Sequence, residues 1–147
     1  MKIIRAGIEE MPLVLPLFHQ YRSFYRQEKD EAKVLDFLSE RLRAKDTVLF
    51  LSMTDDGAAA GFAHLFPIFS SVSVKRHWLL NDLFVHPDHR RKKVGEMLLR
   101  HSQIHARSTG AKGLFLQTEA DNISAQNLYE KLGFRKDPTA CYYEWLL

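Results

Sequence analysis

Cysteine and long apolar runs are scarce in this 147-residue sequence. The single cysteine, Cys141, excludes an intramolecular disulfide. No stretch reaches the roughly 18 uninterrupted apolar residues that a membrane-spanning helix needs, and residues 1–11 lack the apolar run of a signal peptide. We therefore expect a cytoplasmic protein that has no membrane partner.

A large excess of charge of one sign is also absent. The chain has 21 Lys and Arg against 18 Asp and Glu, so its net charge is 21 − 18 = +3, and residues 90–93 account for most of the excess. A basic loop together with Trp and Phe residues could describe a nucleic-acid module, but the aromatic residues fall at apparent core positions and not among the cations. We expect no nucleic-acid partner.

The histidines do not form a metal-binding pattern, although there are seven of them. His86 and His89 flank a proline turn, and no carboxylate or cysteine completes a ligand set around them. We expect no metal.

The centre of the chain reads as a strand, a loop and a helix. Residues 78–85 are apolar except for Asn81 and Asp82, which is typical of a strand buried on both faces of a sheet. Pro87 ends this strand because it cannot donate to a β-ladder. Apolar residues then recur at helical spacing from Val94, which predicts a helix that begins near residue 93.

Four consecutive cations, residues 90–93, precede this helix and Gly95. The first-turn amides of a helix lack intrahelical partners and lie at the positive end of its dipole. A bound phosphate would satisfy these amides and the cations together, whereas cations alone oppose the dipole. On charge alone, a solvated surface loop is the alternative.

The same residues match a known pattern. The order Arg/Gln-x-x-Gly-x-Gly/Ala after a strand maps onto residues 90–95, and Leu98 and Leu99 follow in the helix. This stretch resembles motif A of the GNAT superfamily of acetyl-CoA-dependent N-acetyltransferases. Lys93 departs from the pattern because it replaces the first glycine, which normally lets the backbone approach the ligand closely. The lysine side chain could itself reach a phosphate.

A second stretch, residues 122–134, resembles motif B of the same superfamily, N-x-x-A-x-x-L-Y-x-x-x-G-F. The matching residues are Asn122, Ala125, Leu128, Tyr129, Gly133 and Phe134. Local chemistry agrees, because Asn122 suits a helix N-cap and Gly133 suits the position that follows a helix. The two motifs and their adjoining strands cover about residues 78–147.

The resemblance implies an α/β (α+β) GNAT fold, in which a mixed, mostly antiparallel sheet of about seven strands contains a central splayed parallel pair and is accompanied by four helices. The residue patterns give the same order of elements. We expect strands near 2–6, 47–53, 59–69, 78–85, 113–118, 134–136 and 142–147, and helices near 8–26, 31–43, 93–109 and 122–132. Residues 1–147 are expected to form one N-acetyltransferase domain.

The resemblance also implies the activity: direct transfer of the acetyl group of acetyl-CoA, in a ternary complex, to a primary amine. The amine is a small molecule, a polyamine, or a lysine or N-terminal amine of a peptide. The residues expected to bind acetyl-CoA are Leu83, Phe84, Val85, Arg90, Arg91, Lys92, Lys93, Val94, Gly95, Glu96, Asn122, Ala125, Asn127 and Tyr129. The alternative function is an acetyl-CoA sensor without turnover.

Three residues are predicted to take part in the chemistry, and a fourth, Asp82, has two alternative roles. Related members often read Leu-Glu-Asp-Leu where this chain has Asn81 and Asp82, and Asn81 is not a base, so we expect it to orient water or substrate. Glu119 is the candidate carboxylate that accepts the amine proton, or a charge flanking a turn. Tyr129 is the candidate acid for the leaving thiolate, or a packed core residue. Asp82 is either a structural hydrogen-bond acceptor or a catalytic group.

The last residues of the chain are apolar on both faces of the strand predicted there. They are Tyr142, Tyr143, Trp145, Leu146 and Leu147. An apolar edge strand is normally covered, which predicts a homodimer; the alternative is that neighbouring helices of the same subunit cover both faces.

Overall fold

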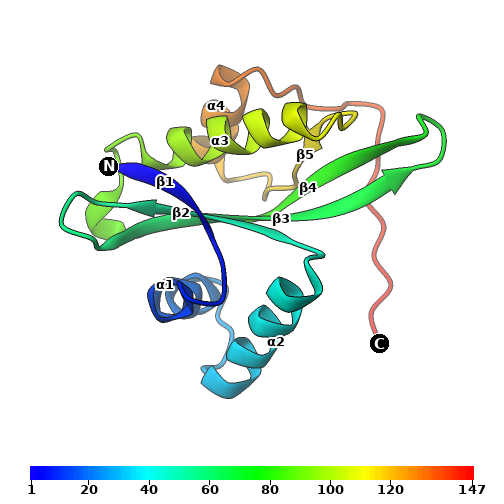
Figure 1. Cartoon of the computed structure of the whole chain (residues 1–147). Helices are drawn as coiled ribbons and strands as arrows, with labels where there is room; N and C mark the ends of the chain where they lie inside the picture. The colour runs from blue at the N-terminus through cyan, green and yellow to red at the C-terminus, as the bar shows by residue number, and fades with distance from the viewer. The chain divides into compact units, whose positions relative to one another are not determined.

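A five-stranded mixed sheet organises the first part of the chain (Figure 1). The computed structural model describes all residues from Met1 to Leu147, and they fall into two compact units, Met1–Gln117 and Thr118–Leu147. The sheet belongs to the first unit, and its strands are β1 (Lys2–Ala6), β2 (Val48–Met53), β3 (Ala59–Ser70), β4 (Lys75–Val85) and β5 (Leu114–Phe115). They lie in the order β1-β2-β3-β4-β5.

Neighbouring strands are antiparallel except for the last pair. β1 to β4 pair consecutively in antiparallel register, whereas β4 and β5 are parallel and pair only through Trp78 with Leu114 and Leu79 with Phe115. The predicted parallel pair at 78–85 and 113–118 is therefore confirmed, although its second strand is shorter than expected. Such a short ladder leaves most of the outer edge of β4 without β5.

Helices cover both faces of the sheet. Figure 1 shows α1 (Met11–Phe24) and α2 (Glu31–Ala44) on one face and α3 (Val94–Ser108) on the other. This double cover explains the apolar character of the central strands, because residues that point to either face are buried. No helix of the chain combines the length and the apolar character that crossing a bilayer requires.

The contacts of single rings show which residues point to each face. Phe62 of β3 stacks on Phe18 of α1 with ring centroids 5.4 Å apart. Trp78 of β4 instead lies 4.6 Å from the ring of His105, which belongs to α3. The core between α1, α2 and the sheet also contains the fully buried Leu38 and Leu51.

The first helix starts later than predicted. It begins at Met11 instead of near residue 8, and Pro12 occupies its first turn, where a missing N–H costs nothing. Pro16 lies inside the helix, which continues to Phe24. α2 keeps its predicted start at Glu31, where the Asp30 side chain accepts a hydrogen bond from the Lys33 amide at 3.0 Å.

The second unit contains α4 (Ile123–Lys131), the last of the four predicted helices. At its end the Gly133 amide donates to the Glu130 carbonyl and the Phe134 amide donates to the Tyr129 carbonyl, both at 3.0 Å. This is a Schellman motif, and Gly133 has the left-handed φ of +86° that the motif requires.

Two predicted strands, 134–136 and 142–147, are wrong, because the structure has no strand after β5 and five strands in place of about seven. The Phe134 amide is used by the helix end, and Asp137 accepts hydrogen bonds from the amide and hydroxyl of Thr139, which forms a local turn. In residues 142–147 the apolar pattern is present, but no neighbouring strand supplies the ladder that a strand needs.

Candidate functional site

The outer edge of β4 opens where β5 ends. The pairing with β5 stops at Leu79, so Leu83, Phe84 and Val85 lie on a stretch of β4 whose only paired strand is β3. Peptide groups on such an edge can bind an extended ligand in the way that an added strand would. These three residues are among those predicted to bind acetyl-CoA, whose pantetheine arm is an extended ligand of this kind.

The opposite edge of the same stretch is held tightly against β3. Gly61 pairs with Val85, and a Cβ atom at residue 61 would lie 2.5 Å from the Phe84 carbonyl oxygen. Only glycine permits this approach. The His86 amide also donates to the Ala60 carbonyl at 2.9 Å, so the end of β4 is fixed before the basic loop begins.

The basic loop follows a single 3-10 turn, η1 (Pro87–His89). The Nε atom of Arg90 donates to the Val85 carbonyl at 3.3 Å, which ties the loop back to the strand end. All four cations, Arg90, Arg91, Lys92 and Lys93, have exposed side chains. Positive charge therefore gathers next to the open edge of β4.

α3 begins directly after these cations. Its N-cap residue is Lys93, which makes no side-chain capping hydrogen bond. Lys93 has a left-handed backbone and is followed by the first helical residue. This sequence of conformations turns successive amides toward one side, which is a common geometry for anion binding. Val94 is buried, Gly95 and Glu96 are partly buried, and the Glu96 carboxylate is paired with Arg100 at 2.8 Å. The uncapped helix start and the adjacent cations fit a diphosphate group.

Lys93, which replaces the usual glycine, has a backbone conformation that suits glycine. Lys93 has φ +63° and ψ +11°, in the left-handed region that glycine adopts without a steric penalty. Arg91 is also left-handed, with φ +59°. The loop thus keeps the backbone conformation for which glycine is suited, at a cost to the lysine of about 1–2 kcal/mol.

This strain predicts a difference between two substitutions. We expect Lys93→Gly to be more stable than Lys93→Ala by about 1 kcal/mol in the free energy of unfolding, because both variants lose the charge and only alanine keeps the Cβ clash. Urea denaturation of the two variants measures it. Equal stabilities would show that residue 93 is not held in the left-handed conformation.

Asn81 lies at the point where β4 and β5 separate. His64 pairs with Asp82 and Leu65 with Leu80, so Asn81 is the extra residue of a β-bulge, and it is exposed. Asp82 is buried and its Oδ2 atom lies 3.2 Å from Nδ1 of His64. A structural role for Asp82 is thereby supported. His64 was not among the predicted residues. Its one signal in the sequence is that it is a polar residue inside an apolar run.

The other predicted residues belong to the second unit. The Asn122 side chain accepts a hydrogen bond from the Ala125 amide at 3.2 Å, which is the capping role. Glu119 and Asn127 are exposed. Tyr129 is partly buried, and its ring lies 5.9 Å from that of Phe134 in an edge-on arrangement. Roles of these residues in binding or catalysis stay predictions.

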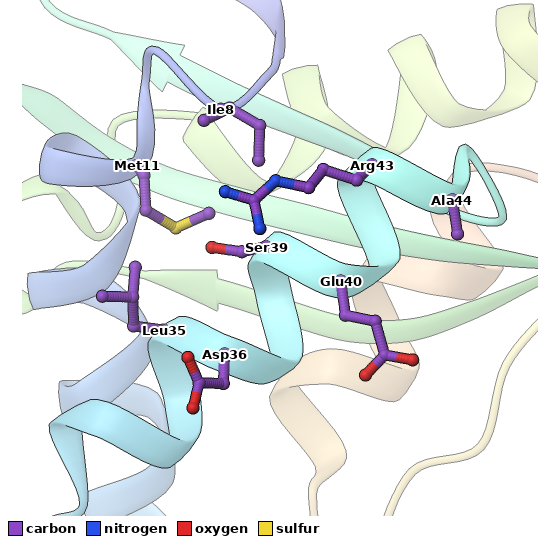
Figure 2. Close-up of a pocket in the computed structure, with 8 residues that line it drawn as sticks. All are labelled: Ile8, Met11, Leu35, Asp36, Ser39, Glu40, Arg43 and Ala44. Carbon is purple, nitrogen blue, oxygen red and sulfur yellow. The ribbon is translucent and has the colours of Figure 1, made fainter.

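A groove of about 670 Å³ lies along α2, and none of the predicted residues lines it. It is lined by Ile8, Met11, Leu35, Asp36, Ser39, Glu40, Arg43 and Ala44. Figure 2 shows the Arg43 guanidinium reaching across the groove between Ile8 and Ser39, with two carboxylates on the same helix. This mixed charge offers no match for the anionic diphosphate, so the basic loop is the better site for it.

Comparison with known proteins agrees with this geometry. Residues 14–134 match the model of the Acetyltransferase (GNAT) family. The chain is 42% identical over 143 residues to the uncharacterized N-acetyltransferase YhfO of Bacillus subtilis, covering 97% of this chain and 95% of the relative. It is 29% identical over 147 residues to a probable acetyltransferase of Haemophilus influenzae, covering 98% and 97%. The crystal structure of a probable acetyltransferase, 39% identical, superposes with a TM-score of 0.95 over 100% of this chain and 98% of that one. The chain belongs to the GNAT family of acetyltransferases and is an acetyl-CoA-dependent N-acetyltransferase.

Proposed function

We propose that the chain acts in the cytoplasm as one catalytic domain that transfers the acetyl group of acetyl-CoA directly to a primary amine in a ternary complex. The observation that carries this proposal is the uncapped start of α3, which adjoins four exposed cations and the open edge of β4. Amides and cations there suit the diphosphate, and the strand edge suits the pantetheine amides. A small amine, a polyamine and a peptide amine are all candidate acceptors.

The reaction sets two demands on the residues of the site. Bound acetyl-CoA supplies an activated thioester carbonyl, while an alkyl ammonium with a pKa of ~10.4 must lose a proton before its nitrogen can attack. We propose that Glu119, which is an exposed carboxylate, accepts this proton. We assign to Tyr129 the protonation of the leaving thiolate. Asn81 is assigned the orientation of water or substrate.

Calorimetric titration with acetyl-CoA, followed by release of free thiol in the presence of an amine panel, tests this function. We expect binding of acetyl-CoA and thiol release that depends on an amine. Binding without thiol release would favour the sensor, which is the second candidate function. Binding of a nucleic acid, and not of acetyl-CoA, would contradict both.

We also propose that the protein forms a homodimer. The terminal residues Tyr143, Trp145 and Leu146 are 89%, 85% and 75% exposed, which is a large apolar surface for a short segment. Light scattering at high micromolar concentration is expected to give twice the mass of 17.1 kDa, and removal of residues 142–147 is expected to restore the monomer mass. A monomer mass for the full chain would contradict the proposal.

A further inference from the structure

A buried polar cluster lies under the β-bulge of β4, on the face that α1 covers. Its members are His64, which is 0% exposed, Asp82, which is 8% exposed, and Tyr21 of α1, whose phenol interacts electrostatically with the carboxylate. The neighbours on this face are aromatic, with Phe62 and Phe84 at 5.7 and 6.1 Å from the Tyr21 ring. Polar groups in such surroundings are costly unless each is satisfied by a partner.

Asp82 is the centre of this cluster. Its Oδ2 atom faces Nδ1 of His64 at 3.2 Å, and its Oδ1 atom accepts a hydrogen bond from Nδ2 of Asn81 at 3.1 Å. A carboxylate oxygen accepts hydrogen bonds, so the His64 tautomer with its hydrogen on Nδ1 fits this contact. The Asp82 carboxylate is thus in contact with β3, through His64, and with the bulge of β4, through Asn81.

The Asp82 carboxylate affects the pKa of the Tyr21 phenol. Burial raises the pKa of Tyr21 most, and the negative charge of Asp82 raises it further. Tyr21 therefore remains neutral. It closes the cluster from the helix side and leaves Asn81 as the exposed member next to the outer edge of the strand.

The carboxylate decides which way the Asn81 amide faces. An asparagine side chain has an NH₂ group that donates and an oxygen that accepts, and the two ends exchange places when the amide turns over. The turned-over amide would set its oxygen against the Asp82 oxygen, so two acceptors would meet without a hydrogen. With the NH₂ group held by Asp82, the oxygen of Asn81 is left to accept from another partner.

We infer that Asp82 is a positioning residue that orients Asn81 so that the Asn81 oxygen accepts an N–H hydrogen bond from the acceptor amine. This inference rests on the proposed function. The bulge places Asn81 two residues beyond the last residue of β4 that pairs with β5, beside the edge proposed for pantetheine. An amine held through one N–H keeps its lone pair for attack, and Asn81 takes no proton. His64 and Tyr21 hold Asp82 in place.

A double-mutant cycle tests the inference in the full-length protein. Asn81→Ala and Asp82→Asn should each raise the KM for an amine that the wild type acetylates, by about tenfold, as expected for a lost hydrogen bond to a polar substrate. The double variant should be no worse than Asn81→Ala alone, because Asp82 acts only through Asn81. The Kd for acetyl-CoA should stay unchanged in all three.

Asp46→Asn is the matched control, since it makes the same carboxylate-to-amide change at a residue that pairs with Arg41 outside the cluster. It should leave the KM for the amine unchanged. Tyr21→Phe removes the phenol hydroxyl of the cluster with little change of shape, so it replaces Asp82→Asn in the cycle if that variant does not fold. Its effect should be smaller and should likewise vanish when Asn81 is alanine.

A spectroscopic measurement separates orientation from general damage. The side-chain NH₂ resonances of Asn81, identified by their loss in Asn81→Ala, should be protected from exchange with water in the wild type and unprotected in Asp82→Asn or Tyr21→Phe. If the wild type still releases thiol in the presence of an amine, either additive effects on KM or unprotected Asn81 resonances would overturn the inference. A wild type that acetylates no amine would overturn the proposed function and this inference with it.

Discussion

Tyr129→Phe is expected to keep the fold and the affinity for acetyl-CoA while it lowers the turnover rate by roughly 10²–10⁴-fold, the range typical of a lost general acid. The substitution removes one hydroxyl and keeps the ring. The edge-on contact with Phe134, which accompanies the Schellman end of α4, should therefore persist.

The expected loss follows from the charge that develops on sulfur. Reference pKa values are ~8.5 for a thiol and ~10 for a phenol, so complete proton transfer from tyrosine to thiolate is uphill in water. A hydrogen bond that strengthens as the thiolate forms still lowers the barrier, because it stabilises the transition state more than the ground state. Removing that bond should affect turnover and leave binding intact.

Packing is the alternative role for Tyr129. It predicts near-normal turnover in Tyr129→Phe, because the packed ring is unchanged. Tyr143→Phe provides a control, since Tyr143 is 89% exposed in the terminal segment and loses the same hydroxyl. Single-turnover measurements, in which chemistry limits the rate, should show the loss in the first variant only. Equal rates for both would leave Tyr129 a packing residue and assign the proton to solvent.

Elements with local signals could be predicted from the sequence. Asp30 and Asn122 are capping residues whose side chains accept from amides three positions later, and both helix starts are where they were expected. Gly133 ends α4 for an equally local reason, its left-handed backbone. Apolar stretches likewise gave β1 to β4 to within a few residues. Such signals are contained in a few neighbouring residues.

Features that depend on distant partners could not be predicted in this way. A strand exists only where another strand supplies a ladder, which is why the apolar residues 142–147 misled the prediction. The cluster of Tyr21, His64 and Asp82 joins residues from a helix and two strands, and its register depends on the one-residue bulge at Asn81. In the candidate site, motif spacing located the basic loop, whereas the left-handed conformation of Lys93 required the structure.

Reversing the charge of Arg90 and Arg91 together is expected to weaken acetyl-CoA binding at least tenfold, or about 1.4 kcal/mol. Both side chains are exposed beside the uncapped start of α3, so glutamates there would repel the diphosphate that the amides attract. Calorimetric titration at several salt concentrations measures the effect. Affinity of the wild type should fall with added salt, because exposed charges are screened, and that of the variant should fall less.

The control must reproduce the change in net charge. Charge reversal at Lys33 and Arg43, two exposed cations of α2, shifts the net charge from +3 to 3 − 4 = −1, as the first double variant does. It should leave the affinity for acetyl-CoA within a factor of about two, because screening limits interactions between exposed charges to about 10 Å at 0.1 M salt. Arg90 also donates to the Val85 carbonyl, so circular dichroism and thermal unfolding must show that the loop variant is folded. Unchanged affinity in the folded loop variant, or an equal loss in the α2 variant, would remove the diphosphate from the loop at the start of α3.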